Sequence, residues 1–340
     1  MDVACVRVPR EQGETTRRKL ADAGLLDHDH EITHEDGTLY IPVTDAEAAA
    51  SVVDADAGGE DAAVAVEVRD LPTRETQQLP DDILGFEPSY ERLGEIVILD
   101  EDDPDRARQI ADAIVASDIP VETVVNRASK VKGDLRVRDW DVLVGETTEA
   151  VHREYGCEFL VDIAEVYFSP RLATERHRVV QQVEAGERVF DMFAGVGPFV
   201  IPMAKRGAEV VGCDLNPVAV EYLEKNAERN GVADRVTAVA GDVREVADDW
   251  TDWADRVVMN LPHSANEFVD TAVALAGDDC VLHYYDIQHE DDLFGPGERA
   301  IRQAVADAGG EYEVEVLTRH EVRSYAPHEK NVCLDVALSR

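Results

Sequence analysis

Four polar side chains in the second half of the chain each follow a short apolar segment. They are Asp191 after "RVF", Asp214 after "VVGC", Asp242 after "TAVAG" and Asn260 after "RVVM". Helical patterns separate these segments, so we expect strands that alternate with helices in a doubly wound parallel sheet. The carboxyl ends of parallel strands meet at one edge of such a sheet, and ligands bind in the crevice beyond it. The four side chains therefore predict one binding pocket.

A glycine turn follows the first of these segments, in "FDMFAGVGPF". Gly195 and Gly197 allow a tight turn between a strand and a helix, and they let a ligand touch the backbone. A nicotinamide-binding fingerprint needs a third glycine where this chain has Val200, which argues against a dehydrogenase. The pattern Asp-x-Phe-x-Gly-x-Gly instead resembles the first motif of class I methyltransferases, which bind S-adenosylmethionine.

This resemblance implies roles for the polar side chains at the other strand ends. Asp214 is placed to accept hydrogen bonds from both ribose hydroxyls, as an acid does in dinucleotide-binding folds. Asp242 is placed to accept one from the adenine amino group. Asn260 precedes Leu261-Pro262 and faces the methyl acceptor in this fold. Two alternatives for Asn260 remain open: a residue that merely ends its strand, or a contact to the methionine end of the cofactor.

The segment "EVYFSPRLATERHR" carries a second group of polar residues. We expect a helix over residues 169–183 with Ser169 as its N-cap. Arg171, Glu175 and Arg178 then lie on one face of this helix, at spacings of four and three residues. Two interpretations compete: an exposed face with ordinary salt bridges, or a set of residues that contact a substrate.

Acidic residues far outnumber basic residues in this sequence. The formal net charge is −39, and the acidic residues are spread along the whole chain. A surface adapted to concentrated salt and a surface that binds basic partners are the two explanations, and the even spread favours the first. Positive charge gathers in "NRASKVKGDLRVRDW", at Arg127, Lys130, Lys132, Arg136 and Arg138. This cluster and the arginines of the expected helix favour an anionic substrate.

Several segments together resemble one family. "KGDLRVRDWDVLVGE", "HREYGCEFLVDIAEVYFSPRLATERHR", "FDMFAGVGPF", "CDLNP" and "NLPHSA" are similar to the archaeal and eukaryal tRNA (guanine-37 N1)-methyltransferase family, and the acidic composition is of a haloarchaeal type. The similarity extends over nearly the whole chain. It implies an enzyme that methylates N1 of guanosine 37 in tRNA with S-adenosylmethionine as cofactor and without a metal.

The expected fold class is α/β, with a C-terminal doubly wound, Rossmann-like class I methyltransferase domain preceded by two smaller α+β domains. We expect a small tRNA-recognition domain at residues 1–72 and a linker at 73–88. An RNA-binding domain at 89–180 and the methyltransferase domain at 181–340 follow. No apolar run approaches the roughly 20 residues of a membrane span, and the start of the chain does not resemble a secretory signal. We therefore expect a cytoplasmic protein without membrane contact, and a monomer because nothing in the sequence demands a dimer.

The family resemblance assigns the chemistry to particular residues. Guanine N1 carries a proton at neutral pH, so a base is needed near N1 and a cation or donor near O6. The resemblance makes Glu175 the base, Arg136 the group that stabilises O6, and Asn260 the residue that orients guanine while Pro262 fixes its loop. The implied cofactor contacts are Tyr167, Arg176, Asp191, Gly195, Gly197, Asp214, Asn216, Asp242 and Asn260. The implied RNA contacts are Arg127, Lys130, Lys132, Arg138 and Arg171.

Two other functions fit parts of the same pattern. A wyosine-pathway aminocarboxypropyl transferase uses the same cofactor and the same tRNA position, but it transfers a different carbon chain. An RNA-binding factor that retains a cofactor fold without catalysis is the second. The "NLPHSA" segment and Glu175 favour methyl transfer over both.

Overall fold

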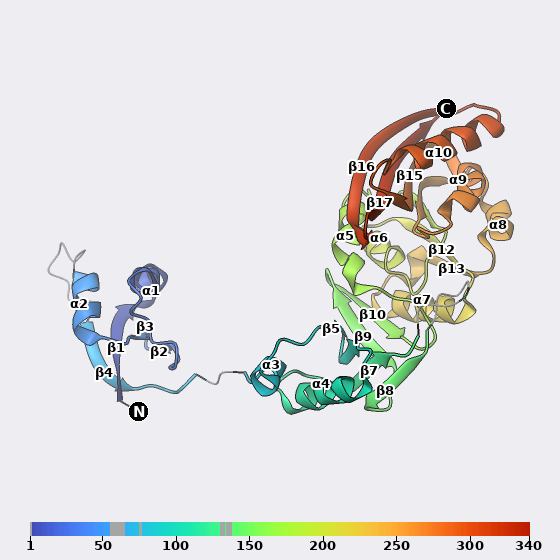
Figure 1. The fold of residues 1–340 in the computed structure, drawn as a ribbon. Coiled ribbons are helices and arrows are strands. Elements are labelled where there is room, and N and C mark those ends of the chain that lie inside the picture. Colours follow the sequence, from blue (N-terminus) through green and yellow to red (C-terminus); the bar gives the residue numbers. More distant parts are fainter. Residues whose placement is uncertain (1, 55–64, 75–76, 130–132, 134–137) are drawn as a thin grey trace. The chain divides into compact units, whose positions relative to one another are not determined.

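The computed structural model describes residues 2–54, 65–74, 77–129, 133 and 138–340. The chain forms two compact units, Met1–Gln78 and Leu79–Arg340 (Figure 1). The expected boundaries at residues 72, 88 and 180 stay a prediction, and each unit is described by itself.

The first unit is a four-stranded antiparallel sheet with two helices. Its strands lie in the order β2-β3-β1-β4, and the elements are β1 (Asp2–Pro9), α1 (Gly13–Asp22), β2 (Thr33–Glu35), β3 (Thr38–Pro42), α2 (Ala46–Asp54) and β4 (Ala65–Asp70). Val6 and Ile41 of the sheet pack with Leu20 of α1 in one buried cluster. Because both helices lie outside a single antiparallel sheet, this unit has the α+β character that the sequence predicts.

The second unit begins with a small mixed sheet in the order β5-β6-β7-β8. Its elements are α3 (Pro80–Leu84), β5 (Tyr90–Leu93), β6 (Ile96–Leu99), α4 (Pro104–Ala116), β7 (Thr123–Arg127) and β8 (Trp140–Val144). The helix α4 begins at a proline, and the Asp103 side chain caps it by accepting from the amide of Asp105 at 3.0 Å. Ile110 and Ile114 of α4 are buried with Val124 of the sheet. A separate hairpin, β9 (Glu149–Glu154) and β10 (Cys157–Asp162), follows.

A seven-stranded sheet forms the C-terminal part, in the order β13-β12-β11-β14-β15-β17-β16 (Figure 1). The strands are β11 (Arg188–Asp191), β12 (Glu209–Asp214), β13 (Val236–Ala240), β14 (Ala254–Met259), β15 (Ala276–His289), β16 (Glu313–Ala326) and β17 (Glu329–Ser339). The first five pair in parallel, whereas β17 is antiparallel to both β15 and β16. The predicted doubly wound sheet is confirmed, and the antiparallel pair β16 and β17 closes one edge of it.

Helices cover both faces of this sheet. They are α5 (Ala173–Val180), α6 (Val200–Lys205), α7 (Pro217–Arg229), α8 (Val243–Val246), α9 (Val269–Leu275) and α10 (Gly295–Asp307). Val189 of β11 is buried with residues of α5, α6 and α7, whereas its neighbour Phe190 is buried with residues of α8, α9 and α10. Successive strand residues point to opposite faces, so the helices form one layer on each side.

Asn226 of α7 ties three elements together. Its side chain accepts from the amide of Leu160 in β10 at 2.7 Å and donates to the Leu160 carbonyl at 3.1 Å. It also donates to the carbonyl of Val196, between the two glycines of the turn, at 3.0 Å. The hairpin β9-β10 and the glycine turn are therefore both held to α7.

Local expectations differ from the structure in several places. The helix expected over residues 169–183 is a 3-10 turn, Pro170–Leu172, followed by α5, and the Ser169 side chain makes no cap hydrogen bond. The expected linker contains α3, and β5, β9 and α2 were not expected. These three elements are short or rich in alanine, and they lack the alternation or flanking signals that identify longer elements.

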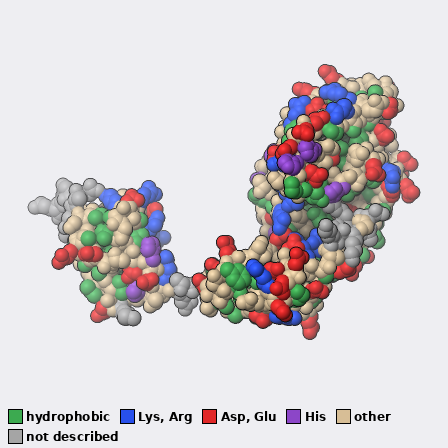
Figure 2. Space-filling model, in the orientation of Figure 1, with side chains coloured by type: hydrophobic (Ala, Val, Ile, Leu, Met, Phe, Trp, Pro, Cys, Tyr) green, Lys and Arg blue, Asp and Glu red, His purple; other side chains and the backbone are tan. Residues whose placement is uncertain are grey.

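The described residues contain no helix long and apolar enough to cross a membrane. Figure 2 shows that acidic side chains are scattered over the visible face of both units and do not gather in one patch. This distribution agrees with the spread of acidic residues along the sequence.

Candidate functional site

The glycine turn connects β11 to α6 and needs both of its glycines. Gly195 and Gly197 have positive φ angles of 53° and 93°, a region that other L-residues rarely adopt. A Cβ atom on Gly197 would lie 2.5 Å from Cδ1 of Leu223, whereas one on Gly195 would meet only the carbonyl oxygen of Tyr167 at 3.9 Å. The Gly195 side of the turn is thus open to a ligand that contacts the backbone, and Tyr167 lies beside it.

Asp214, at the end of β12, is oriented by two backbone amides. Gly195 N donates to Oδ2 at 2.7 Å and Asn216 N donates to Oδ1 at 2.9 Å. Burial raises the pKa of Asp214, and these two hydrogen bonds counteract part of that effect. The carboxylate is therefore fixed beside the glycine turn with further lone pairs available for hydroxyl donors.

Asp191, at the end of β11, has a buried oxygen without a partner. Phe193 N donates to Oδ1 at 3.2 Å, and Oδ2 has no hydrogen-bond partner among the described residues. Burial, with a smaller effect of the Asp214 charge, raises the pKa of Asp191 to about 7. A buried oxygen of this kind is rare unless a ligand or water completes its bonding. The donor or cation that Asp191 lacks fits a positively charged cofactor in this crevice.

Three other predicted cofactor contacts have partners within the protein. Asp242 caps α8 and pairs with Arg244, and this pairing lowers the pKa of Asp242. The amide of Asn216 caps α7 and donates to the carbonyl of Glu165 at 2.8 Å. Arg176 is buried and donates to Glu154 and to the Ser169 carbonyl. Asn216 and Arg176 thus hold the segment around Tyr167, and direct cofactor contacts by the three side chains stay predictions.

Asn260 follows β14 at the same edge of the sheet. Its side-chain amide makes no hydrogen bond within the part of the chain that the structure describes. The carbonyl of Pro262 accepts from Ile287 N at 3.1 Å, which ties the loop to β15. Pro262 is buried and His263 is exposed, and both line a cavity of about 430 Å³ with Tyr325. The loop is anchored while the amide of Asn260 stays available.

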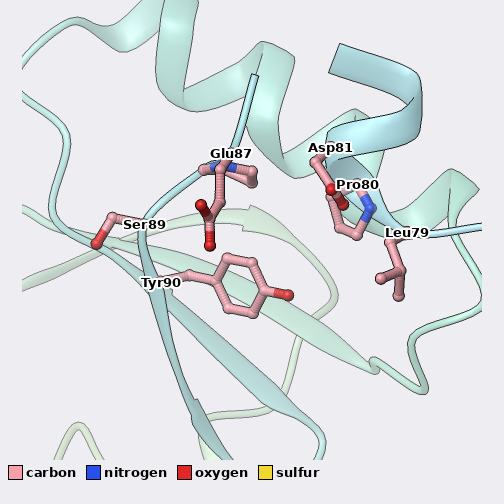
Figure 3. A pocket seen from close by; sticks show the side chains of 7 residues that line it. Leu79, Pro80, Asp81, Glu87, Ser89 and Tyr90 are labelled. Carbon is pink, nitrogen blue, oxygen red and sulfur yellow. The ribbon is translucent and has the colours of Figure 1, made fainter. Parts of the chain in front are cut away.

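A second cavity, of about 550 Å³, lies in the segment from Leu79 to Tyr90 (Figure 3). Two of the side chains that line it, Asp81 and Glu87, are acidic, and none of its lining residues is a predicted site residue. An acidic lining is unfavourable for an RNA phosphate. This cavity therefore adds nothing to the crevice at the sheet edge.

Glu175 of α5 is buried, with 5% of its surface exposed. Arg178 binds its carboxylate in a bidentate manner: Nε donates to Oε2 and Nη2 donates to Oε1, both at 2.8 Å. The hydroxyl of Tyr285 donates to Oε1 at 2.8 Å, and His320 Nε2 lies 3.2 Å from Oε2. The exposed salt-bridged face that the helical spacing allowed is therefore wrong for Glu175.

Arg178 joins Glu175 to a second buried carboxylate. Its Nη1 donates to Oδ2 of Asp335 at 2.6 Å, and His283 Nδ1 donates to Oδ1 at 2.7 Å. Burial disfavours the charge of Asp335, but the bonds from His283 and Arg178 outweigh it and hold the pKa of Asp335 well below its usual range. The other ring nitrogen of His283 accepts from Arg256 at 2.7 Å, and Arg256 pairs with Glu187.

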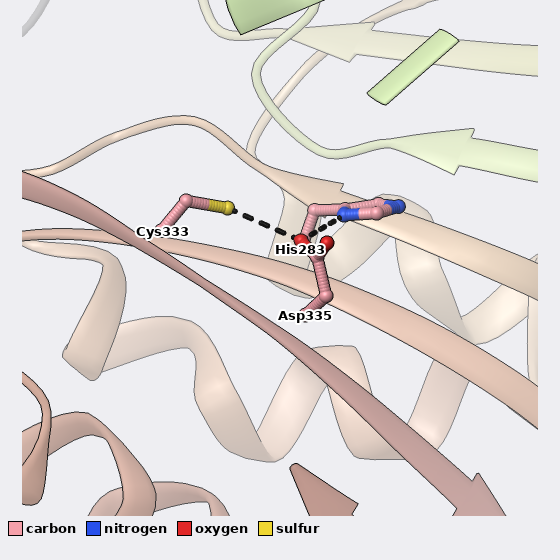
Figure 4. A group of neighbouring side chains, drawn as sticks. All are labelled: His283, Cys333 and Asp335. Carbon is pink, nitrogen blue, oxygen red and sulfur yellow. Dashed lines mark hydrogen bonds and ion pairs between the residues drawn. The ribbon is translucent and has the colours of Figure 1, made fainter. Parts of the chain in front are cut away.

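His283, Cys333 and Asp335 bring possible metal-ligating atoms within 4.8 Å of one another (Figure 4). Both nitrogens of His283 and both oxygens of Asp335 already have partners, among them Arg178 and Arg256. Burial also raises the pKa of the Cys333 thiol well above its ordinary value, whereas a metal binds the thiolate. Two neighbouring guanidinium groups repel a cation, so this cluster is an ion-pair network and not a metal site.

The predicted RNA contacts are only partly described. Lys130, Lys132 and the predicted O6 stabiliser Arg136 lie outside the described residues. Arg127 and Arg171 converge on Glu91, and Arg127 also reaches Asp100. Arg138 lies over the ring of Trp140 at 5.4 Å. The structure thus brings Arg127 and Arg171 together from segments far apart in sequence, with an acid between them.

Motifs and helical spacing do not single out Tyr285, His283, Asp335 or His320 as site residues. The sequence does mark two of them as unusual. His283 and Asp335 are polar residues within the apolar strands "CVLHYYDI" and "VCLDVAL". Polar residues at core-facing strand positions need partners. The partners themselves come from other elements, so their identity is not readable from the strand pattern.

Similarity to known proteins extends over nearly the whole chain. Residues 150–317 match the model of the TRM5/TYW2 methyltransferase domain, and residues 5–50 match that of the tRNA methyltransferase 5 N-terminal domain. Residues 75–148 match the TYW2 N-terminal domain. The tRNA (guanine(37)-N(1))-methyltransferase Trm5b of Pyrococcus abyssi is 39% identical over 338 residues, which are 98% of each chain.

A relative with a different activity is also similar. The tRNA(Phe) (4-demethylwyosine(37)-C(7)) aminocarboxypropyltransferase of Pyrococcus horikoshii is 30% identical, over 77% of this chain and 93% of the relative. Among solved structures, the complex of aTrm5 and tRNALeu has a TM-score of 0.69 and 33% identity, and it covers 98% of this chain and 99% of that chain. Methanocaldococcus jannaschii TYW2 in complex with AdoMet has a TM-score of 0.60 and 27% identity, over 74% of this chain and 100% of that one.

The state of Asp191 predicts how cofactor binding depends on pH. With its pKa near 7, the carboxyl is mostly neutral at pH 6 and mostly ionised at pH 8. A cationic ligand favours the ionised form, so S-adenosylmethionine should bind about tenfold more tightly at pH 8 than at pH 6. Calorimetry without tRNA measures this, and Asp191→Asn should remove most of the dependence. The exposed Asp249→Asn should behave as wild type, and a flat wild-type profile would contradict the assignment.

Proposed function

The chain belongs to the TRM5/TYW2 methyltransferase family, and we propose that it transfers a methyl group from S-adenosylmethionine to N1 of guanosine 37 in tRNA. It is an S-adenosylmethionine-dependent enzyme that acts on tRNA. The observation that carries the proposal is the match to a methyltransferase of this specificity over 98% of both chains. The aminocarboxypropyl transferase relative is matched over 77% of this chain, and it is the second candidate.

The buried charges around Glu175 support its role as the base. Among the described residues, Glu175, Asp335 and Glu187 pair with two guanidinium groups, those of Arg178 and Arg256. With His283 neutral, this group carries one excess negative charge while Glu175 is ionised and none when Glu175 is protonated. Asp335 is held ionised by His283 and Arg178. A proton passed from guanine N1 to Glu175 would balance the charges of this group, which supports Glu175 as its acceptor.

The other site residues orient the reactants. The cofactor supplies a methyl group on a sulfonium, which leaves as a thioether. Asp191, Asp214 and the turn at Gly195 hold the cofactor, and the amide of Asn260 offers both donors and an acceptor to the edge of guanine. Pro262 keeps that amide in place through its bond to β15. Arg136 stabilises the negative charge that develops on O6 once N1 loses its proton.

The rest of the chain recognises the tRNA. Guanosine 37 leaves the base stack of the anticodon loop to reach the crevice, which costs little for a loop base. The domains proposed at residues 1–72 and 89–180 bind the tRNA, the first by its overall shape and the second through Arg127, Lys130, Lys132, Arg138 and Arg171. The described site residues come from a single chain, and we place the enzyme in the cytoplasm as a monomer.

Removal of the base tests the chemistry directly. Glu175→Gln should lower the single-turnover rate of methyl transfer by about 10²- to 10⁴-fold, because the N1 proton loses its acceptor. The affinity for S-adenosylmethionine should change little, and a thermal melt checks folding. Glu184→Gln, an exposed glutamate beyond the same helix, is the matched control. A Glu175→Gln rate within about twofold of wild type would remove Glu175 from the role of base.

Asn260→Ala separates the three explanations for this residue. If Asn260 positions guanine, the single-turnover rate should fall on the order of 10- to 10³-fold, because misplacement of a reacting base is costly. Cofactor affinity measured by calorimetry should stay within about threefold. A large loss of cofactor affinity would assign Asn260 to the methionine end of the cofactor. A lower melting temperature with a normal rate would make it a turn residue.

The acidic surface leads to a proposal about salt. We expect methyl transfer to persist or increase in molar KCl, since screening confines the repulsion between a net charge of −39 and tRNA to roughly 3 Å at ~1 M salt. Initial rates and tRNA affinity between 0.1 and 3 M KCl are the measurement. Affinity that increases steadily as salt is removed would show an ordinary phosphate-binding surface and contradict salt adaptation.

A further inference from the structure

Asp335 of β17 is buried, and both of its carboxylate oxygens accept hydrogen bonds from other side chains. Oδ1 accepts from Nδ1 of His283 at 2.7 Å (Figure 4) and from Nη2 of Arg178 at 3.1 Å. Oδ2 accepts from Nη1 of Arg178 at 2.6 Å and from the side-chain amide of Gln182 at 3.1 Å. A carboxylate has about four lone-pair positions, and Asp335 is 1% exposed, so it has no position left for a substrate. Any effect of Asp335 on the reaction passes through these partners.

His283 holds Asp335 in a defined orientation. The Nε2 atom of His283 lies 2.7 Å from Nη1 of Arg256. A guanidinium only donates hydrogen bonds, so Nε2 is the acceptor and Nδ1 carries the proton that Asp335 accepts. His283 is fully buried, and Arg256 pairs with Glu187 at 2.9 Å. Asp335 is therefore anchored to residues of β15 and β14 as well as to Arg178.

Arg178 extends this anchoring to α5. Its Nη1 and Nη2 atoms bind Asp335, and its Nε and Nη2 atoms bind Glu175, both at 2.8 Å. The guanidinium is planar and presents its donors in a rigid fork. Because two edges of one rigid group are occupied, the position of the Asp335 carboxylate constrains that of the Glu175 carboxylate.

The helix alone does not fix the Glu175 side chain in this way. An ion pair three residues apart on a helix is weakly stabilising by itself, since two long side chains must be ordered to form it. The hydroxyl of Tyr285 adds one hydrogen bond, to Oε1 of Glu175 at 2.8 Å. The bond from Arg178 to Asp335 joins residues 157 positions apart and links the pair on α5 to the sheet.

We propose that Asp335 is a positioning residue for Glu175, which it orients through Arg178. The proposal rests on the proposed role of Glu175 as the base. A general base must lie within hydrogen-bond distance of the proton that it removes, and a displacement of about 1 Å costs about 100-fold in rate. In this role Asp335 contacts neither guanine nor the proton. It keeps the Glu175 carboxylate where N1–H of guanine arrives.

Asp335→Asn tests the proposal with little change in shape. The amide has one acceptor oxygen, and its NH2 group would face a donor of Arg178, His283 or Gln182. The single-turnover rate of methyl transfer should fall by about 10- to 100-fold, a smaller loss than expected for Glu175→Gln because the base itself remains. Affinity for S-adenosylmethionine, measured by calorimetry, should stay within about threefold, since Asp335 is not a predicted cofactor contact.

The double variant Glu175→Gln/Asp335→Asn distinguishes positioning of the base from a general loss of structure. Once the base is absent its orientation no longer matters, so the double variant should match the rate of Glu175→Gln within about twofold. If Asp335 only stabilised the fold, its loss would be independent of Glu175, and the two rate factors would multiply.

Asp278→Asn is the matched control, because Asp278 of β15 is an exposed aspartate that pairs with Arg340 at 3.1 Å. It should keep the wild-type rate, and thermal melts confirm that every variant is folded. If Asp335→Asn does not fold, Arg178→Lys takes its place in the same comparison. An ammonium group keeps the charge but lacks the planar fork that binds both carboxylates.

Two results would overturn the proposal while Glu175 remains the base. One is a rate for Asp335→Asn, or for Arg178→Lys in its place, within about twofold of wild type. The other is a double variant that is slower than Glu175→Gln by the full factor of the second substitution. A failure of the base assignment appears separately, as a wild-type rate for Glu175→Gln alone, and it would remove the positioning role as well.

Discussion

Arg178 is shared by two buried carboxylates, and the geometry of the proposed base depends on this arrangement. An ion pair taken out of water is stable only if every partner is present, because removal of one leaves an uncompensated buried charge. Here one guanidinium binds Glu175 through Nε and Nη2 and Asp335 through Nη1 and Nη2. Asp335 of β17 therefore fixes the position of Glu175 through Arg178. A substitution of the buried Asp335 would therefore alter the contacts of Arg178 and, through it, the position of the proposed base.

The order of the strands makes this arrangement possible. Placement of β17 between β15 and β16 pairs Asp335 with His283 and Cys333 with both Tyr285 and His320. All these side chains then lie under α5, whose residues 175 and 178 are neighbours on one face of the helix. The closing hairpin therefore contributes to the site as well as to the core. A one-residue shift in its register would turn these side chains to the opposite face.

Much of the fold could be predicted from sequence because it depends on local patterns. The strands that lead to Asp191, Asp214 and Asn260 are apolar and regularly spaced, and the glycine turn after the first of them has few conformational alternatives. The network around Glu175 could not be predicted in the same way. His283 and Asp335 are 52 residues apart, and their pairing depends on strand order, which no local period encodes. The sequence shows the helical spacing of Glu175 and Arg178. Whether such a pair is a surface salt bridge or part of a site depends on the burial of the two side chains, which the spacing does not give.

The scarcity of basic residues constrains how this chain binds RNA. It has 33 lysines and arginines against 72 acidic residues, and Arg127, Arg171, Arg176, Arg178 and Arg256 all pair with acids of the protein. Affinity from phosphate contacts falls steeply with salt, whereas buried pairs are screened much less. In concentrated salt the surface charges therefore contribute little, and the buried network around Glu175 keeps its strength. We therefore expect recognition to depend more on the shape of the tRNA and on the pocket for the extruded base than on the proposed basic contacts, while the proposed base Glu175 lies in a network that the fold has removed from solvent.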